Sequence, residues 1–203
     1  MAEPILPQLP TDERVEVDSV EWLFTPDWPG ERLLARVRAG DARLSDASGA
    51  EVSDRPEVAA LLGRAVRATR ATLDGTWTAS PFLDDEGEQH ERHAYVATDL
   101  LELDGEPLLD VPFQERHRLL ESVVEEGLQV RVGPVVKQPV AGWLAGWRRL
   151  GFTHVLARHQ NARYRPGERA NDFLRVPIES APAGGLLRRV VGGGRGAPRR
   201  IRD

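Results

Sequence analysis

The amino-acid sequence offers one amine for covalent chemistry, because Lys137 is the single lysine among 27 basic residues. The others are arginines, whose guanidinium groups stay protonated at any accessible pH and cannot attack as nucleophiles. The sequence has no cysteine, which excludes disulfides and thiolate metal sites and is typical of a cytoplasmic protein. Any covalent step that needs a lysine would therefore have to use Lys137.

Histidines and carboxylates are the remaining candidates for chemistry. His154 and His159 lie five residues apart in an expected strand, so their side chains should point to opposite faces and not share a metal ion. Asp99, with Asp74 and Asp104, could hold Mg²⁺, although Asp-Gly pairs also suit ordinary turns. The pattern defines no metal site, and Asp99 is a candidate ligand only.

The charge is uneven along the chain. The whole sequence has a formal net charge of −5, yet residues 181–203 carry one acid, Asp203, against six arginines: Arg188, Arg189, Arg195, Arg199, Arg200 and Arg202. This glycine-rich segment, at about +5, is predicted to be a flexible basic tail on an acidic body. Such a tail could grip phosphates in a salt-dependent way, or simply keep the protein soluble.

The apolar pattern predicts one folded domain over residues 20–180, preceded by an extended lead-in at 1–19. Three helices and many short strands are expected, with helices at 56–66, 112–126 and 139–150, a hairpin at 32–45, and strands at 20–24, 70–79, 94–101, 128–136, 153–158 and 173–178. Trp143 and Trp147 keep helical spacing and are expected in the core. Because strands and helices do not alternate strictly, the fold class is α+β, with mixed or antiparallel sheets and flanking helices.

Four segments, in order, resemble one enzyme family. They are WLFTPDWPGERLLARVRAGDARLSDASGAEV at 22–52, LDGTW at 73–77, YVATDLLELDGEPLLDVPFQERHRLLESVV at 95–124 and THVLARHQNARYRPGERANDFLRVPI at 153–178. A DLLxLDG strand, a P-x-x-ER-x-x-LL helix and then Y-x-PG-x-R are similar to the adenylation domain of ATP-dependent DNA ligases, in particular the bacterial type used in end joining. The resemblance implies the nucleotidyltransferase fold of these ligases.

The family's chemistry depends on a lysine that attacks the α-phosphate of ATP, with Mg²⁺ absorbing charge. The resemblance places Asp27 at this lysine's position, while Gly30 and Arg32 are kept. A carboxylate there would repel a triphosphate and could form no phosphoramidate. Active ligases also carry an OB-fold domain after this one, but only about 25 residues follow position 178, so no OB-fold domain is expected in this sequence.

The resemblance implies further site residues. The glutamate of the family's LDGE strand is Thr76, and lysines of its last segments are Arg158 and Arg175. A vestigial nucleotide pocket would comprise Asp27, Gly30, Arg32, Thr76, Asp99, Arg158 and Arg175. ATP and Mg²⁺ would be cofactors only if this pocket survives. Candidate phosphate or DNA contacts are Arg163, Arg165, Arg169, Arg188 and Arg189.

The sequence thus predicts a catalytically degenerate ligase-like protein that binds DNA ends or nicks, a nucleotide, or a repair or end-joining protein. Two alternatives stay open. The chain could be an active nucleotidyltransferase that uses Lys137 or is completed by a partner, or a purely structural interaction protein. No apolar run approaches the roughly 18–20 residues that span a bilayer, so no membrane partner is expected.

Overall fold

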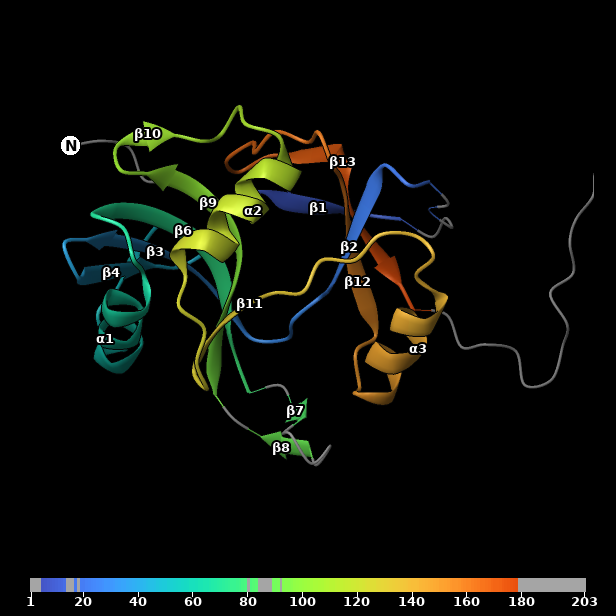
Figure 1. Ribbon diagram of the computed structural model, residues 1–203, viewed down its shortest axis with the longest axis horizontal. Coiled ribbons are helices and arrows are strands. Elements are labelled where there is room, and N and C mark those ends of the chain that lie inside the picture. The colour runs from blue at the N-terminus through green and yellow to red at the C-terminus, as the bar shows by residue number, and fades with distance from the viewer. Residues whose placement is uncertain are drawn as a thin grey trace, which may run out of the picture.

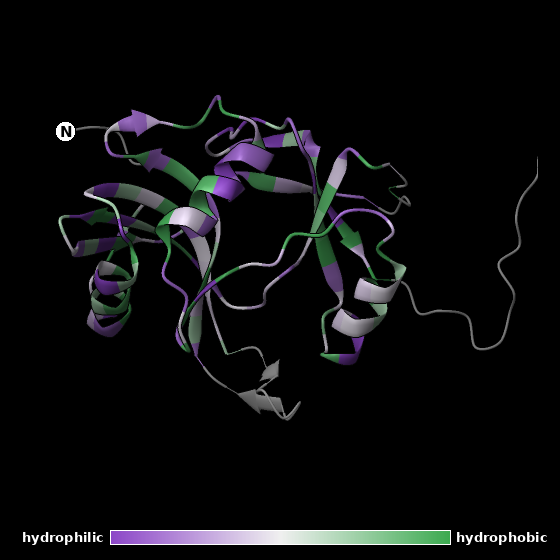
Figure 2. Cartoon of the chain, in the orientation of Figure 1, coloured by the Kyte–Doolittle hydropathy of each residue, from purple (hydrophilic) through white to green (hydrophobic). Residues whose placement is uncertain are grey.

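The computed structural model describes residues 5–13, 17, 19–79, 81–83, 89–91 and 93–178, with the backbone alone at 81–83 and 89–91. Within these ranges the chain forms two main β-sheets with helices packed beside them (Figure 1). Figure 2 shows apolar and polar residues interspersed along both the strands and the helices. The architecture is α+β, as predicted.

The smaller sheet has the strand order β1-β13-β12-β2, formed by β1 (Leu9–Asp12), β13 (Arg169–Pro177), β12 (His154–His159) and β2 (Trp22–Pro26). β12 is antiparallel to both of its neighbours, and β1 is parallel to β13. Residues 9–12, which lie within the segment expected to be a lead-in, are therefore a strand of this sheet.

The larger sheet has the order β10-β9-β6-β3-β4-β5, with β11 paired to β9. Its strands are β3 (Glu31–Arg38), β4 (Asp41–Ser45), β5 (Glu51–Val52), β6 (Arg70–Thr78), β9 (Ala94–Leu103), β10 (Glu106–Pro107) and β11 (Val130–Val132). β3, β6 and β9 pair antiparallel, and β11 joins β9 in parallel. β7 (Pro81–Leu83) and β8 (Gln89–Glu91) pair with each other.

Helices α1 (Pro56–Ala65) and α2 (Phe113–Val123) pack on the larger sheet, and α3 (Ala141–Arg149) lies beside the smaller one (Figure 1). The predicted helices and strands are all present, with ends that shift by a few residues. In the described part of the chain, no helix is long and apolar enough to cross a membrane.

One core assignment was wrong. Trp147 is buried in the cluster beneath α3, as expected, but Trp143 is 53% exposed. Trp143 lies one turn before Trp147, and the two rings contact each other with their centroids 6.0 Å apart. Helical spacing places both rings on one side of α3, but it does not show how far the buried surface extends along the helix.

Candidate functional site

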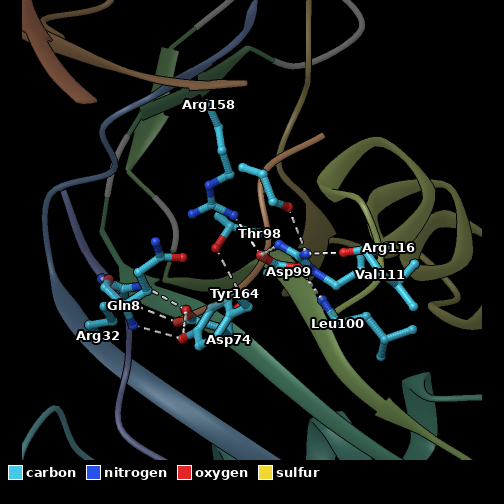
Figure 3. A network of polar contacts seen from close by, with 11 residues as sticks. Gln8, Arg32, Asp74, Thr98, Asp99, Leu100, Val111, Arg116, Arg158 and Tyr164 are labelled. Atoms are coloured by element: carbon cyan, nitrogen blue, oxygen red, sulfur yellow. Dashed lines mark hydrogen bonds and ion pairs between the residues drawn. The ribbon is translucent and has the colours of Figure 1, made fainter. Parts of the chain in front are cut away.

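The residues of the predicted nucleotide pocket come from both sheets. Asp27 follows β2, and Gly30 precedes β3, while the other positions lie within strands: Arg32 in β3, Thr76 in β6, Asp99 in β9, Arg158 in β12 and Arg175 in β13. Figure 3 shows the centre of this region, where Arg158 reaches from the smaller sheet to Asp99 of the larger one. The two sheets thus meet through charged side chains.

Asp99 is fully buried between two arginines. Arg116 of α2 donates from Nε to Oδ1 at 2.7 Å and from Nη2 to Oδ2 at 2.8 Å, and Arg158 donates from Nη1 to Oδ2 at 2.5 Å. Burial alone would raise the pKa of Asp99, but the two guanidinium groups outweigh it and hold this pKa below its ordinary value. Because both oxygens are engaged by cations, Asp99 has little capacity left for Mg²⁺.

Arg158 is enclosed on both faces by aromatic rings. Its guanidinium carbon lies 4.4 Å from the ring centre of Phe113 and 3.9 Å from that of Phe173, within the range of cation–π attraction. Burial lowers the pKa of Arg158, and the nearby Asp99 offsets part of that effect. Its Nε finds no acceptor among the described residues. Arg158 therefore holds an internal position instead of reaching toward solvent for a phosphate.

A second buried carboxylate, Asp74 of β6, organises the N-terminal segment. Arg32 donates to it from Nε at 2.9 Å and from Nη2 at 2.6 Å, and the Tyr164 hydroxyl donates at 2.7 Å. Burial would lower the pKa of Arg32, but Asp74 outweighs it and raises this pKa. Gln8 joins the network through its backbone, donating to Tyr164 at 2.9 Å and accepting from Arg32 at 2.7 Å. Arg32 is thus committed to an internal ion pair.

Asp27, at the position of the family's reactive lysine, is paired with Arg175 of β13. Arg175 Nε lies 2.6 Å from Asp27 Oδ2, and its Nη2 lies 3.2 Å from Nδ1 of His154. The Asp27 amide donates to the carbonyl oxygen of His154 at 3.1 Å, so the backbone also fixes this position. The Asp27 and Arg175 side chains are only 26% and 36% exposed. Asp27 and Arg175 therefore form a partly buried ion pair.

Lys137, the remaining amine, lies on the surface. Its Nζ is 3.4 Å from Oε1 of Gln114 at the start of α2. In the described part of the chain it exchanges no hydrogen bond with Asp27 or Asp99. This placement gives no support to a relocated nucleophile.

Gly30 and Thr76 have positions set by the backbone. Gly30 has φ +142°, and a Cβ added there would lie 2.2 Å from the carbonyl oxygen of Trp77. This close approach requires glycine whether or not a phosphate binds. Thr76 is half-buried in β6, directly opposite Arg32 of β3. Its hydroxyl replaces a carboxylate at a position where the family has glutamate.

The arginines predicted to contact DNA fall into two groups. Arg163 and Arg165 lie on the connection between β12 and β13, where each meets an acid at 3.2 Å, Asp110 and Asp172 respectively. Arg169, at the start of β13, donates to the backbone carbonyl of Pro10. Arg188 and Arg189 lie outside the described residues, as does the whole predicted tail at 181–203.

Sequence reasoning missed one fully buried charge of the site, Arg116. Arg116 is fully buried, pairs with Asp99, and also donates to the carbonyl oxygens of Val111 and Ala162. The available signal was the P-x-x-ER pattern, which puts Arg116 on the first turn of α2. Phe113 and Phe173, which enclose Arg158, carried no signal, because they come from segments 60 residues apart.

The residues present do not fit ATP with Mg²⁺. Attack on the α-phosphate of ATP needs a neutral amine, and binding of the triphosphate needs free cationic groups. Position 27 is a carboxylate, and the nearby guanidinium groups are already paired with carboxylates. The described residues contain no cluster of three or more histidines or carboxylates able to hold a metal ion. We derive no catalytic step through either group.

Comparison with known proteins identifies relatives. The end-joining DNA repair protein LigD of Mycobacterium tuberculosis H37Rv is 30% identical over 166 residues, which are 76% of this chain and 21% of LigD. The crystal structure of the ligase domain of M. tuberculosis LigD matches with a TM-score of 0.68 and 28% identity, over 84% of this chain and 58% of that domain. A mycobacterial DNA ligase D complexed with ATP also matches with a TM-score of 0.68. No family model matches the sequence.

The two sheets, their order and these relatives define a nucleotidyltransferase domain of the ATP-dependent DNA ligases. More particularly, the chain belongs to the bacterial end-joining type of this family. It spans about a fifth of the length of the LigD proteins that it matches. The described residues form the two-sheet domain, and no OB-fold barrel is found among them.

Replacement of Asp99 by asparagine should destabilise the fold and change its response to acid. We expect Asp99→Asn to lower the free energy of unfolding by about 3–5 kcal/mol, because Arg116 and Arg158 stay buried without their counter-ion. The depressed pKa of Asp99 gives stability that is fully present above 3.8 and is lost as the pH falls through the lower folded value. The variant should therefore lose less stability on acidification, as measured by urea unfolding at several pH values.

The matched control is Asp110→Asn, which removes a carboxylate that is 88% exposed and paired with Arg163. This change should leave the unfolding midpoint unchanged, because exposed ion pairs contribute little. Equal effects of the two substitutions would contradict the assigned role of Asp99.

Proposed function

We propose that this chain is a non-adenylylating relative of the end-joining DNA ligases that works by binding and not by catalysis. The ion pair between Asp27 and Arg175 carries the proposal. Attack on the α-phosphate of ATP needs a nitrogen lone pair aimed at phosphorus. A carboxylate at this position supplies no such lone pair and repels the triphosphate instead.

The balance of the Asp27 charge by a neighbouring arginine supports this proposal. Replacing a lysine by a carboxylate beside an anion site would usually leave an unmatched charge. Here Arg175 provides the matching guanidinium at 2.6 Å, and Arg158 is likewise absorbed by Asp99. The domain can therefore be stable without a bound nucleotide to balance the charges of these two arginines. This suits a protein that has the fold of the ligase family but does not carry out its reaction.

DNA ends or nicks are the ligands we propose, within DNA repair, because the relatives are named as DNA ligases and as an end-joining DNA repair protein. Arg163 and Arg165 supply guanidinium groups on the connection between β12 and β13, Arg169 supplies one at the start of β13, and Arg188 and Arg189 supply more from the tail. Arg163 and Arg165 are themselves exposed, at 65% and 43% of their side-chain surface, and exposed ion pairs contribute little, so a phosphate could replace their acids. We also propose that a repair or end-joining protein binds the same domain.

The absence of self-adenylylation can be tested with the whole chain. After incubation with α-labelled ATP and Mg²⁺, denaturing electrophoresis should reveal no labelled protein, and Lys137→Ala should behave like the parent. An active DNA ligase treated in parallel confirms that the assay works. A label that survives denaturation and disappears in Lys137→Ala would contradict the proposal.

DNA binding can be tested by fluorescence anisotropy with nicked and blunt-ended duplexes at several salt concentrations. We expect weak binding, and in Arg188→Gln/Arg189→Gln the slope of log affinity against log salt should fall by about two, because two phosphate contacts are lost. The matched control, Arg38→Gln/Arg43→Gln, removes two exposed arginines of β3 and β4 and should leave the slope unchanged. Failure of the parent chain to bind either duplex at low salt would exclude DNA as the ligand.

A further inference from the structure

A groove of about 470 Å³ lies beside the site and has no part in the pairing of Asp27 with Arg175. It is bounded by the end of β2, by β11, by the C-terminal end of α2 and by α3. Most of its lining residues are apolar or aromatic, among them Pro26, Trp28, Trp147, Leu150 and Phe152. An apolar groove of this size is large enough to take several side chains of an extended peptide.

The remaining lining residues of the groove make it acidic. Glu121 and Glu126 line it with a single cation, Arg131, so the lining has a formal charge of −1. Both glutamates are about half exposed, at 60% and 47% of their side-chain surface. Glu126 lies 3.3 Å from Arg131, whereas Glu121 lies 3.6 Å from His117. The groove therefore suits a segment that combines aliphatic side chains with arginines.

The chain itself contains such a segment. Residues 186–191 read Leu-Leu-Arg-Arg-Val-Val, with two arginines between two pairs of aliphatic residues. The rest of the tail is mainly glycine, alanine, proline and arginine, with Ile201 as its one further branched aliphatic residue. The segment also belongs to the stretch that carries about +5 on a chain whose net charge is −5.

The tail starts next to the groove. Ile178 donates from its backbone to the carbonyl oxygen of Thr153 at 2.8 Å, and Phe152, the residue before Thr153, is part of the groove wall. Ile178 also packs against the cluster that contains Trp147 and Phe152. Leu186 is eight positions after Ile178 in the chain, which is enough to span about 26 Å when extended. The segment can therefore reach any part of the groove.

We propose that residues 186–191 dock in this groove within the same molecule. The aliphatic side chains pack on Trp147 and Phe152, and Arg188 and Arg189 pair with Glu121 and Glu126. Docking uses the same two arginines that would contact DNA, so DNA and the groove compete for the tail. The docking proposal does not depend on the proposed function, because the groove could hold the tail whether or not the chain binds DNA. The test below accordingly contains no DNA.

Engineered cysteines test the docking directly, since the chain contains none of its own. In full-length Arg131→Cys/Leu187→Cys, a short bifunctional thiol cross-linker should join the groove lining to the tail. Two matched variants serve as controls. In Ala47→Cys/Leu187→Cys, the first cysteine lies in the turn after β4, at the end of the larger sheet away from the groove (Figure 1). In Arg131→Cys/Ala197→Cys, the second cysteine lies in the tail but outside residues 186–191.

We expect the Arg131→Cys/Leu187→Cys variant to cross-link within one molecule about tenfold faster than either control, because docking raises the effective concentration of the two thiols. Arg188→Glu/Arg189→Glu in that background should reduce the rate to the level of the controls. Equal rates in all three variants, or cross-linked dimers in place of cross-linked monomers, would overturn the proposal. A cross-link in a chain that fails to bind DNA would still support docking while excluding the proposed function.

Discussion

Every charge that this domain buries has to be matched inside the protein, and the fold is organised around that requirement. Asp99 shows it most clearly, since it lies fully buried between Arg116 of α2 and Arg158 of β12. This cluster joins the larger sheet, a helix and the smaller sheet at one point. The packing of the two sheets therefore depends on this carboxylate.

The same requirement explains what happened to the cationic positions that the ligase family uses for ATP. In this chain they are filled by arginines that bind carboxylates of the protein: Arg158 binds Asp99 and Arg175 binds Asp27. A guanidinium group held by a carboxylate at 2.5–2.6 Å is not available to a phosphate unless the internal pair opens. These two arginines are balanced by carboxylates of the protein itself, so the fold needs no bound anion to neutralise them.

Much of the fold could be predicted from sequence, because it rests on local patterns. The hairpin at 32–45 has Gly40-Asp41 at its turn, Pro56 begins α1, and the DLLxLDG segment forms β9. The strand at residues 9–12 was not predicted, because its partner is β13, about 160 residues later. Such long-range pairing leaves no local periodicity to detect.

The sequence allowed us to predict which residues belong to the candidate site, but not which of them contact each other. Comparison of segments identified Asp27, Arg158 and Arg175 as substituted positions, yet their pairing depends on how β2, β12 and β13 lie side by side. The role of Arg116 was missed for a similar reason, since a buried arginine on a helix looks like a surface residue until its carboxylate is located. Charge pairs between distant segments are set by the tertiary structure and not by spacing in the sequence.

The central claim is that Asp27 repels ATP and occupies Arg175, and a calorimetric titration of ATP into the parent chain and into Asp27→Asn tests it most directly. The variant keeps the size of the side chain, removes its charge and leaves Arg175 with Asp12, at 3.6 Å, as its remaining carboxylate partner. The account predicts that Asp27→Asn binds ATP at least about tenfold more tightly than the parent, a difference of roughly 1.4 kcal/mol. Equal affinity in the two proteins, or tighter binding by the parent, would contradict it.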